Sequence, residues 1–211
     1  ELLNNTITAD QTICSGSTPA LLNGSLPTGG TGAYTYQWQS CTTGASGTFT
    51  NISGATSQNY QPGALAQSTW YQRVVNSGVC STVSGVVAIT VNPPISNNTI
   101  SSAQSICYNS TPALLTGTTP TGGNGTYTYK WQESTAGVGG PFTDIAGATS
   151  SDYQPSALTA NTWYRRVVSS LPCTDSPSNV IAITVGSVFT VSCTTTSPLC
   201  VGSPNGTATA N

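Results

Sequence analysis

The feature that most constrains this chain is an internal repeat with a period of 93 residues. Residues 4–80 match residues 97–173 without a gap, and 47 of the 77 aligned positions are identical. After Cys80 the register slips by one residue, so that 87–91 matches 181–185. Solenoid repeats are usually about 20 to 50 residues long, whereas a complete β-sandwich domain has about 100. The period therefore predicts whole domains in tandem.

Each copy has the pattern of short strands separated by turn residues. In the first copy, strict alternation over 34–39 places Tyr34, Tyr36 and Trp38 on one face of a strand. Because both copies have their aromatic residues at the same sandwich positions, we expect most of them to belong to the core. The candidate strands of the first copy are 5–8, 20–22, 34–39, 48–52, 58–61, 69–75 and 86–91. No window has a helical apolar period, so the predicted fold class is all-β, with tandem antiparallel sandwiches.

The repeat also sets the expected domain boundaries. We assign 1–93 to the first repeat, 94–186 to the second, and 187–211 to the start of a truncated third β repeat. Pro93-Pro94 lies at the first joint and favours a stiff, extended spacer. We therefore expect a rod-like array. Because two strands alone are marginal in water, we expect the third unit to continue in a longer polypeptide or to pack on a neighbouring chain.

Several short motifs resemble a known family of surface repeats. They are Tyr-x-Tyr-x-Trp-Gln at 34–39, Ile-x-Gly-Ala-Thr at 52–56, Tyr-x-Pro at 60–62 and Thr-x-Tyr at 69–71, followed by a Val-rich strand. This pattern resembles the Ig-like (PKD-like) tandem repeats of Bacteroidota cell-surface adhesins exported by the type IX system, such as the gliding-motility adhesin. The resemblance covers 4–185. In addition, 199–209 resembles the opening of that adhesin's own repeat. It implies an Ig-like sandwich and a non-catalytic role at the cell surface.

The charge content excludes several classes of function. Only 5% of the residues are charged, with four Lys and Arg in all and no histidine. Phosphate neutralisation needs clustered cations, so nucleic acid is not expected as a partner. No stretch approaches the roughly 20 apolar residues of a membrane-spanning helix, so membrane insertion is not expected either.

The same residues argue against catalysis and cofactors. Without histidine, no Ser-His-Asp or Cys-His nucleophilic set can form. Asp144 and Asp152 are the nearest pair of acids, but Asn51 and Asn59 replace them in the first copy. No Asp-x-Asp run suggests a calcium site. We therefore expect no enzyme activity, no catalytic residue, no cofactor and no metal.

Two cysteine positions recur in both copies. Cys14 is equivalent to Cys107, and Cys80 is equivalent to Cys173. Secreted domains favour disulfides, so the recurrence predicts the bonds Cys14–Cys80 and Cys107–Cys173, each tying one end of its own sandwich. Buried free thiols are the alternative. Disulfides imply an oxidising, extracellular setting.

The other three cysteines have no such counterpart. Cys41, which Ser134 replaces in the second copy, is either a free thiol, the interpretation we favour, or a crosslinking point between chains. Cys200 lies in a Cys-x-Gly-Ser context like that of Cys14, and its candidate partners are Cys193 or a residue beyond 211.

Two hypotheses about function follow. The leading one is a structural and adhesive segment of a large extracellular protein, with the rest of its own chain and other cell-surface subunits as partners. The second is an accessory glycan-binding module of a secreted polysaccharide-degrading enzyme. For glycan binding the candidates are Trp70 and Trp163, because each must face away from the neighbouring tyrosine on an extended strand.

Overall fold

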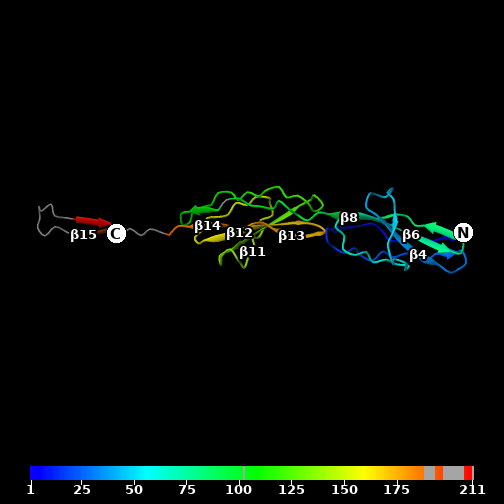
Figure 1. Cartoon of the computed structure of the whole chain (residues 1–211). Helices are drawn as coiled ribbons and strands as arrows, with labels where there is room; N and C mark the ends of the chain where they lie inside the picture. The colour runs from blue at the N-terminus through cyan, green and yellow to red at the C-terminus, as the bar shows by residue number, and fades with distance from the viewer. Residues whose placement is uncertain (102, 188–192, 197–206, 211) are drawn as a thin grey trace.

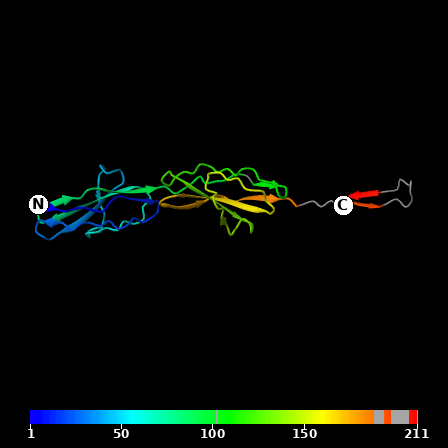
Figure 2. The same ribbon diagram turned by 180° about the vertical axis from the view of Figure 1, so that it is seen from behind.

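The computed structural model describes residues 1–101, 103–187, 193–196 and 207–210. Two β-sandwiches follow one another end to end along the molecule, and the views in Figures 1 and 2 agree on this arrangement. The described residues contain strands and no helix. The predicted fold class, tandem all-β sandwiches, is therefore confirmed.

The main sheet of the first repeat has six strands. Its order is β2-β8-β6-β4-β5, and β7 also pairs with β6. Only β2 and β8 pair in parallel; the other pairs are antiparallel. The strands are β2 (Gln11–Cys14), β4 (Thr35–Cys41), β5 (Thr50–Asn51), β6 (Thr69–Ser77), β7 (Cys80–Val83) and β8 (Val87–Asn92).

The second repeat builds the same sheet from equivalent segments. Its order is β11-β10-β12-β14-β9, with β13 paired to β12, and again only the pair β14 and β9 is parallel. The strands are β9 (Gln104–Ile106), β10 (Thr128–Ser134), β11 (Thr143–Asp144), β12 (Thr162–Ser170), β13 (Cys173–Pro177) and β14 (Ile181–Val185).

The facing layer of each sandwich is made of much shorter pairings. In the first repeat, β1 (Leu2–Leu3) pairs with β3 (Thr28–Gly29), and single bridges join Ile7 to Gly24 and Leu22 to Tyr60. The turn-rich sequence between the bridging residues explains why the predicted strands 5–8, 20–22 and 58–61 are reduced here to isolated bridges.

A tryptophan lies at the centre of each interior. Trp38 is fully buried on β4, its indole N–H donates to Ser57 O at 3.0 Å, and its ring centroid lies 5.7 Å from that of Tyr60. Trp131 has the same burial and donates to Ser150 O at 3.0 Å. A buried indole needs such an acceptor, so the alternation that places Trp38 inward also fixes the loop that covers it.

The two interiors are separate. One buried cluster lies entirely in the first repeat: Leu22, Trp38, Ala55, Tyr71, Val87 and Ile89. The other lies entirely in the second: Ile100, Leu115, Trp131, Ala148, Tyr164, Ile181 and Ile183. Each repeat therefore closes its own core.

The segment predicted as a third unit is described only in part. β15 (Cys193–Thr196) pairs antiparallel with β16 (Thr207–Ala210). The remaining positions of 188–211 lie outside the described residues, so the expectation of a third domain stays a prediction.

Candidate functional site at the junction of the two repeats

One side of the junction is the end of the first repeat from which the chain leaves. β2 runs parallel to β8, and Cys14 is the register partner of Asn92, the last residue of β8. Ser15 N donates to Asn92 O at 2.9 Å, and Ser17 N donates to Cys14 O at 3.0 Å. The Cys14 side chain is therefore held beside the point where the backbone crosses to the second repeat.

The other side is the β12–β13 hairpin of the second repeat. Cys173 opens β13 and pairs with Ser170 across the hairpin. The neighbouring turn packs against the incoming linker, with Gly123 N donating to Pro93 O at 2.8 Å. Gly122 has φ +82°, and a Cβ there would lie 2.1 Å from Pro94 O, so only glycine allows this approach. The diproline linker thus packs directly against the end of the second sandwich that presents Cys173. We call each such end of a sandwich a pole.

A disulfide joins the two sides. Cys14 and Cys173 are 159 residues apart in sequence, and their Cα atoms lie 4.9 Å apart. The bond links the first repeat to the second at the boundary between the two sandwiches, where the labels β8 and β13 lie next to each other in Figure 1.

The predicted bonds Cys14–Cys80 and Cys107–Cys173 are therefore wrong. Within the first repeat, Cys14 lies beyond the Thr69 end of β6, whereas Cys80 follows its Ser77 end. At about 3.3 Å per residue, this nine-residue strand holds the two poles about 26 Å apart. A disulfide needs Cα atoms within about 7 Å, so the link can form only between one repeat and the next.

The equivalent thiols on the outer poles are unpaired. Cys80 is half-buried and Cys107 is exposed, and both are free cysteines. Both are therefore free thiols, but neither is fully buried as the alternative in the sequence analysis expected.

Cys41 is also a free thiol, as we favoured from the sequence, but it is buried. Its sulfur lies 3.2 Å from Thr43 Oγ1, and the loop at Gly47 covers it closely enough that a Cβ there would lie 2.3 Å from Sγ. Of the other candidates, Cys200 lies outside the described residues, as does the side chain of Cys193.

The candidate stacking residues lie on the outer face of each main sheet. Trp70 is half-buried and pairs across the sheet with Cys41, while the next residue, Tyr71, is buried in the core. Trp163 and Tyr164 repeat this alternation. Trp70 and Trp163 thus have the orientation that the strand period predicts, and they are half-covered.

A buried arginine in each repeat escaped the sequence analysis. Arg73 is fully buried with no carboxylate among its hydrogen-bond partners. Its guanidinium donates to Asn5 Oδ1 at 2.9 and 3.1 Å, to Gln58 O at 2.8 Å and to Ser25 O at 2.9 Å, and it lies 5.1 Å from the Tyr36 ring centroid. Burial lowers the pKa of Arg73. Five donors in a planar fork suit this set of neutral acceptors, so the arginine ties three loops to the sheet.

Arg166 makes the equivalent set of contacts in the second repeat. It donates to Asn98 Oδ1, Ser151 O and Thr118 O. A Cβ at Gly117 would lie 1.8 Å from Arg166 Nη1. A signal was present in the sequence, because Arg73 and Arg166 lie two residues after the core tyrosines and so face inward on an alternating strand.

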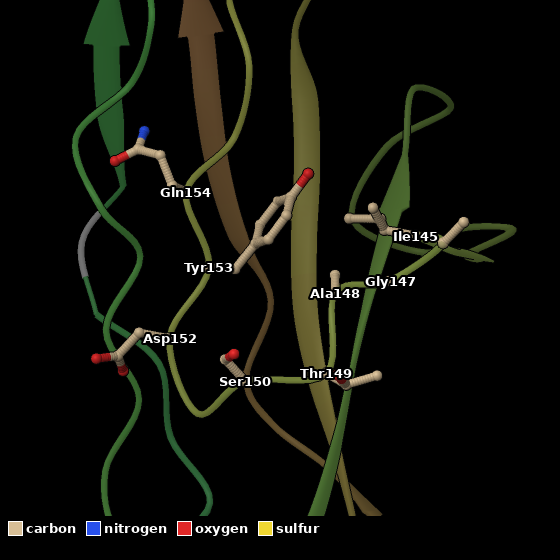
Figure 3. Close-up of a pocket in the computed structure, with 9 residues that line it drawn as sticks. Ile145, Gly147, Ala148, Thr149, Ser150, Asp152, Tyr153 and Gln154 are labelled. Carbon is tan, nitrogen blue, oxygen red and sulfur yellow. The ribbon is translucent and has the colours of Figure 1, made fainter.

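The acids that could have formed a catalytic pair have other partners. Asp144 pairs with exposed Lys130 at 3.1 Å and accepts from Gln132 at 2.6 Å; these contacts, Gln132 first, lower the pKa of Asp144. Asp152 accepts from Gly117 N at 2.9 Å. It lines an open hollow of about 340 Å³ over 145–154, where its carboxylate points away from Tyr153 and Thr149 (Figure 3). The hollow thus has a single acid.

Among the described residues, no group of three or more Cys, Asp or Glu side chains is placed to hold a metal ion. No helix long and apolar enough to cross a membrane occurs in the described ranges.

The comparison with protein families gives a match over both repeats. The model of a family described as a domain of unknown function, DUF8696, matches residues 3–93 and 96–187. No curated protein matches the chain in sequence.

Solved structures share the architecture at low sequence identity. The extracellular domains 3–5 of Drosophila OTK match with a TM-score of 0.52 and 9% identity, over 89% of this chain and 62% of that one. The insect immune protein hemolin matches with a TM-score of 0.45 and 11% identity, over 92% and 54%. The N-terminal four Ig domains of Dscam1 match with a TM-score of 0.36 and 16% identity, and the chain spans 44% of that structure. At these identities the likeness shows the fold alone, two tandem Ig-like sandwiches.

Proposed function

We infer that this chain, which belongs to the DUF8696 family of domains of unknown function, is a non-catalytic structural and adhesive segment of a large extracellular protein. The observation that carries the proposal is the Cys14–Cys173 bond. It joins two domains that each have a complete core, so its effect is on how the domains are held together. Such a bond persists in an oxidising, extracellular setting.

The surface chemistry supports a spacer role. The fully buried cations Arg73 and Arg166 are withdrawn into the cores, and Lys130 is paired with Asp144. The polar surface is therefore mainly hydroxyl and amide groups, which suits neutral contacts with other surface proteins better than charge-driven binding. The partners we propose are the rest of a longer chain and other cell-surface subunits.

A finer assignment rests on the sequence resemblance alone. The motifs at 34–39, 52–56 and 60–62 resemble repeats of Bacteroidota adhesins exported by the type IX system. We propose that the parent protein is a surface adhesin or filament of this kind, with a role in adhesion or gliding. The complete gene tests this: further repeats of the same module and a type IX export signal support it, and a catalytic domain contradicts it.

One observation favours a second candidate function, glycan binding by an accessory module. Trp70 and Trp163 retain partial exposure on the outer face of each sheet, and aromatic rings there can stack on sugars. Neither residue lines one of the hollows described among residues 40–50, 124–143, 145–154 or 169–171, whereas a ligand site is usually a cleft with converging polar groups. We therefore keep the spacer role first.

A binding experiment separates the two candidates. An antibody against the chain should label intact cells that produce the full-length protein, and the purified chain should show no saturable binding on a glycan array. Saturable binding that is lost in Trp70→Ala and Trp163→Ala would establish the alternative. Tyr108→Ala is the matched control, because Tyr108 is an aromatic residue of 49% exposure in the turn that follows β9.

A further inference from the structure

We propose that Cys107 and Cys80 are the two halves of further links of the Cys14–Cys173 type, each formed with another copy of this module placed head to tail. Cys107 occupies the position of Cys14 in its repeat, and Cys80 occupies the position of Cys173. This inference rests on the proposed structural role in an array of modules. The partner of the pole that carries Cys107 is a pole of the Cys80 type from another copy of the module, and the partner of the pole that carries Cys80 is a pole of the Cys107 type.

The pole that carries Cys107 is built like the pole that carries Cys14. Asn109 N donates to Leu158 O at 2.8 Å, as Gly16 N does to Leu65 O at 2.8 Å. The turn after each cysteine is closed by the same bond, from Ser110 N to Cys107 O at 3.1 Å and from its counterpart in the first repeat at 3.0 Å. Cys107 itself is exposed and unpaired.

The pole that carries Cys80 is built like the pole that carries Cys173. Cys80 pairs with Ser77 across the β6–β7 hairpin, in the same register as Cys173 with Ser170. Ser77 Oγ accepts from Thr31 N at 2.9 Å, and Ser170 Oγ accepts from the equivalent backbone N–H at 3.0 Å.

The seat for an incoming linker is repeated as well. Gly29 has φ +84°, and a Cβ there would lie 2.1 Å from Glu1 O, just as Gly122 lies against Pro94 O. Tyr34 OH donates to Gly29 O at 2.9 Å, and Tyr127 OH donates to Gly122 O at 2.7 Å. Each outer pole is thus half of a junction whose assembled form is visible between the two repeats.

Cys80 and Cys107 cannot form a disulfide with each other within one pair of repeats. β7, which begins at Cys80, lies at the end of the array near the N-terminus, whereas β9 and β14 end at the opposite extremity of the second repeat. A further repeat, docked as the first and second repeats dock, brings a hairpin cysteine to Cys107. A preceding repeat brings a Cys14-type thiol to Cys80.

The chemistry is thiol–disulfide exchange with a small-molecule disulfide such as oxidised glutathione. The Cys107 thiolate attacks the oxidant and releases one glutathione thiolate; the hairpin thiolate then attacks the mixed disulfide and releases the second. Two protein thiols lose two electrons and two protons, and the oxidant becomes two glutathione thiols.

A tandem fusion tests the proposal without depending on concentration. Residues 1–187 are joined directly to a second, complete chain of 1–211. Three residues then separate Val185 from Leu2 of the second chain, as three separate Val91 from Ile95 at the natural junction. The protein is refolded with reduced and oxidised glutathione, alkylated with N-ethylmaleimide, digested without reduction and analysed by mass spectrometry.

We expect one peptide that joins Cys107 of the first half to Cys80 of the second half for every two Cys14–Cys173 peptides, because each half forms its own Cys14–Cys173 bond. Cys107→Ser in the first half should abolish it, whereas Cys107→Ser in the second half and Cys41→Ser should leave it unchanged. If Cys14–Cys173 forms in both halves while Cys107 of the first half and Cys80 of the second are recovered alkylated, the proposal is overturned. Glycan binding by the same protein would contradict the structural role and leave the disulfide result intact, so the two failures are distinguishable.

Discussion

Replacing Cys14 with serine should destabilise both repeats, including the one that does not contain the substitution. While the first repeat is folded, it holds Cys14 beside Asn92, so the bond closes a loop of about 80 residues, 93 to 173, around the second repeat. The same geometry closes a loop of similar length around the first repeat when the second is folded.

The size of the effect follows from the entropy of loop closure. Crosslinking about 80 residues restricts the unfolded chain by about 4.5 kcal/mol in the chain-entropy model. For a domain of this size, about 1 kcal/mol shifts Tm by about 4 to 8 °C, so we expect Tm to fall by about 20 °C or more. Serine at position 14 adds little strain of its own, because the side chain is only half-buried.

Differential scanning calorimetry of the oxidised protein measures this effect. Cys80→Ser and Cys107→Ser are the matched controls, since both cysteines are free in this chain, and each should shift Tm by less than about 3 °C. If Cys80→Ser lowered Tm as much as Cys14→Ser, or if reducing agent left the Tm of the wild-type protein unchanged, the reasoning about the junction would be refuted.

Three further predictions concern the individual sandwiches. Arg73→Ala should lower the free energy of unfolding of the first repeat by about 3 to 5 kcal/mol in urea titrations, because three part-buried acceptors lose their donor; Arg165→Gln, which installs the residue of the first repeat, should change the free energy of unfolding of the second repeat by less than about 1 kcal/mol. Burial raises the pKa of Tyr71 to about 12, so the unfolded state loses the phenol proton at a lower pH than the folded state does. The free energy of unfolding should therefore fall by about 2 to 3 kcal/mol between pH 10 and 12. Tyr71→Phe should reduce the decrease of Tm over this pH range, and an unchanged decrease would refute the assignment. Asp144→Asn breaks an exposed ion pair with Lys130 and should lower the free energy of unfolding, measured by urea titration, by no more than about 0.5 kcal/mol. A larger loss would show that the pair contributes more to stability than an exposed ion pair does.

The β architecture could be predicted because its signals are local. The alternation around Trp38 and the recurrence of every strand at a fixed offset depend only on neighbouring positions and on the repeat. The facing layer was less predictable, since the segments that bridge at Ile7 and Leu22 are too short and turn-rich for strand pairing to extend.

The disulfide pairing could not be read from the repeat. Equivalence shows that Cys14 and Cys107 occupy the same place, but it does not say whether a bond stays within a copy or joins two copies. That choice depends on strand direction: the parallel pairing of β2 with β8 puts Cys14 at the exit pole, and the length of β6 puts Cys80 at the other. Arg73 is a different case: composition treats an arginine as a surface charge, whereas the strand period from Tyr71 places it on the inner face, where neutral acceptors satisfy it.

The position of the bond determines how tension would travel through this pair of domains. When the chain is pulled from positions before Cys14 and after Cys173, the pull passes directly between the two sulfur atoms, and the intervening backbone bears none of it. Those 159 residues correspond to about 57 nm of extension at about 3.6 Å per residue, which remain hidden until the bond is reduced. Two domains linked in this way stay close together under a strong pull even if both sandwiches lose their fold.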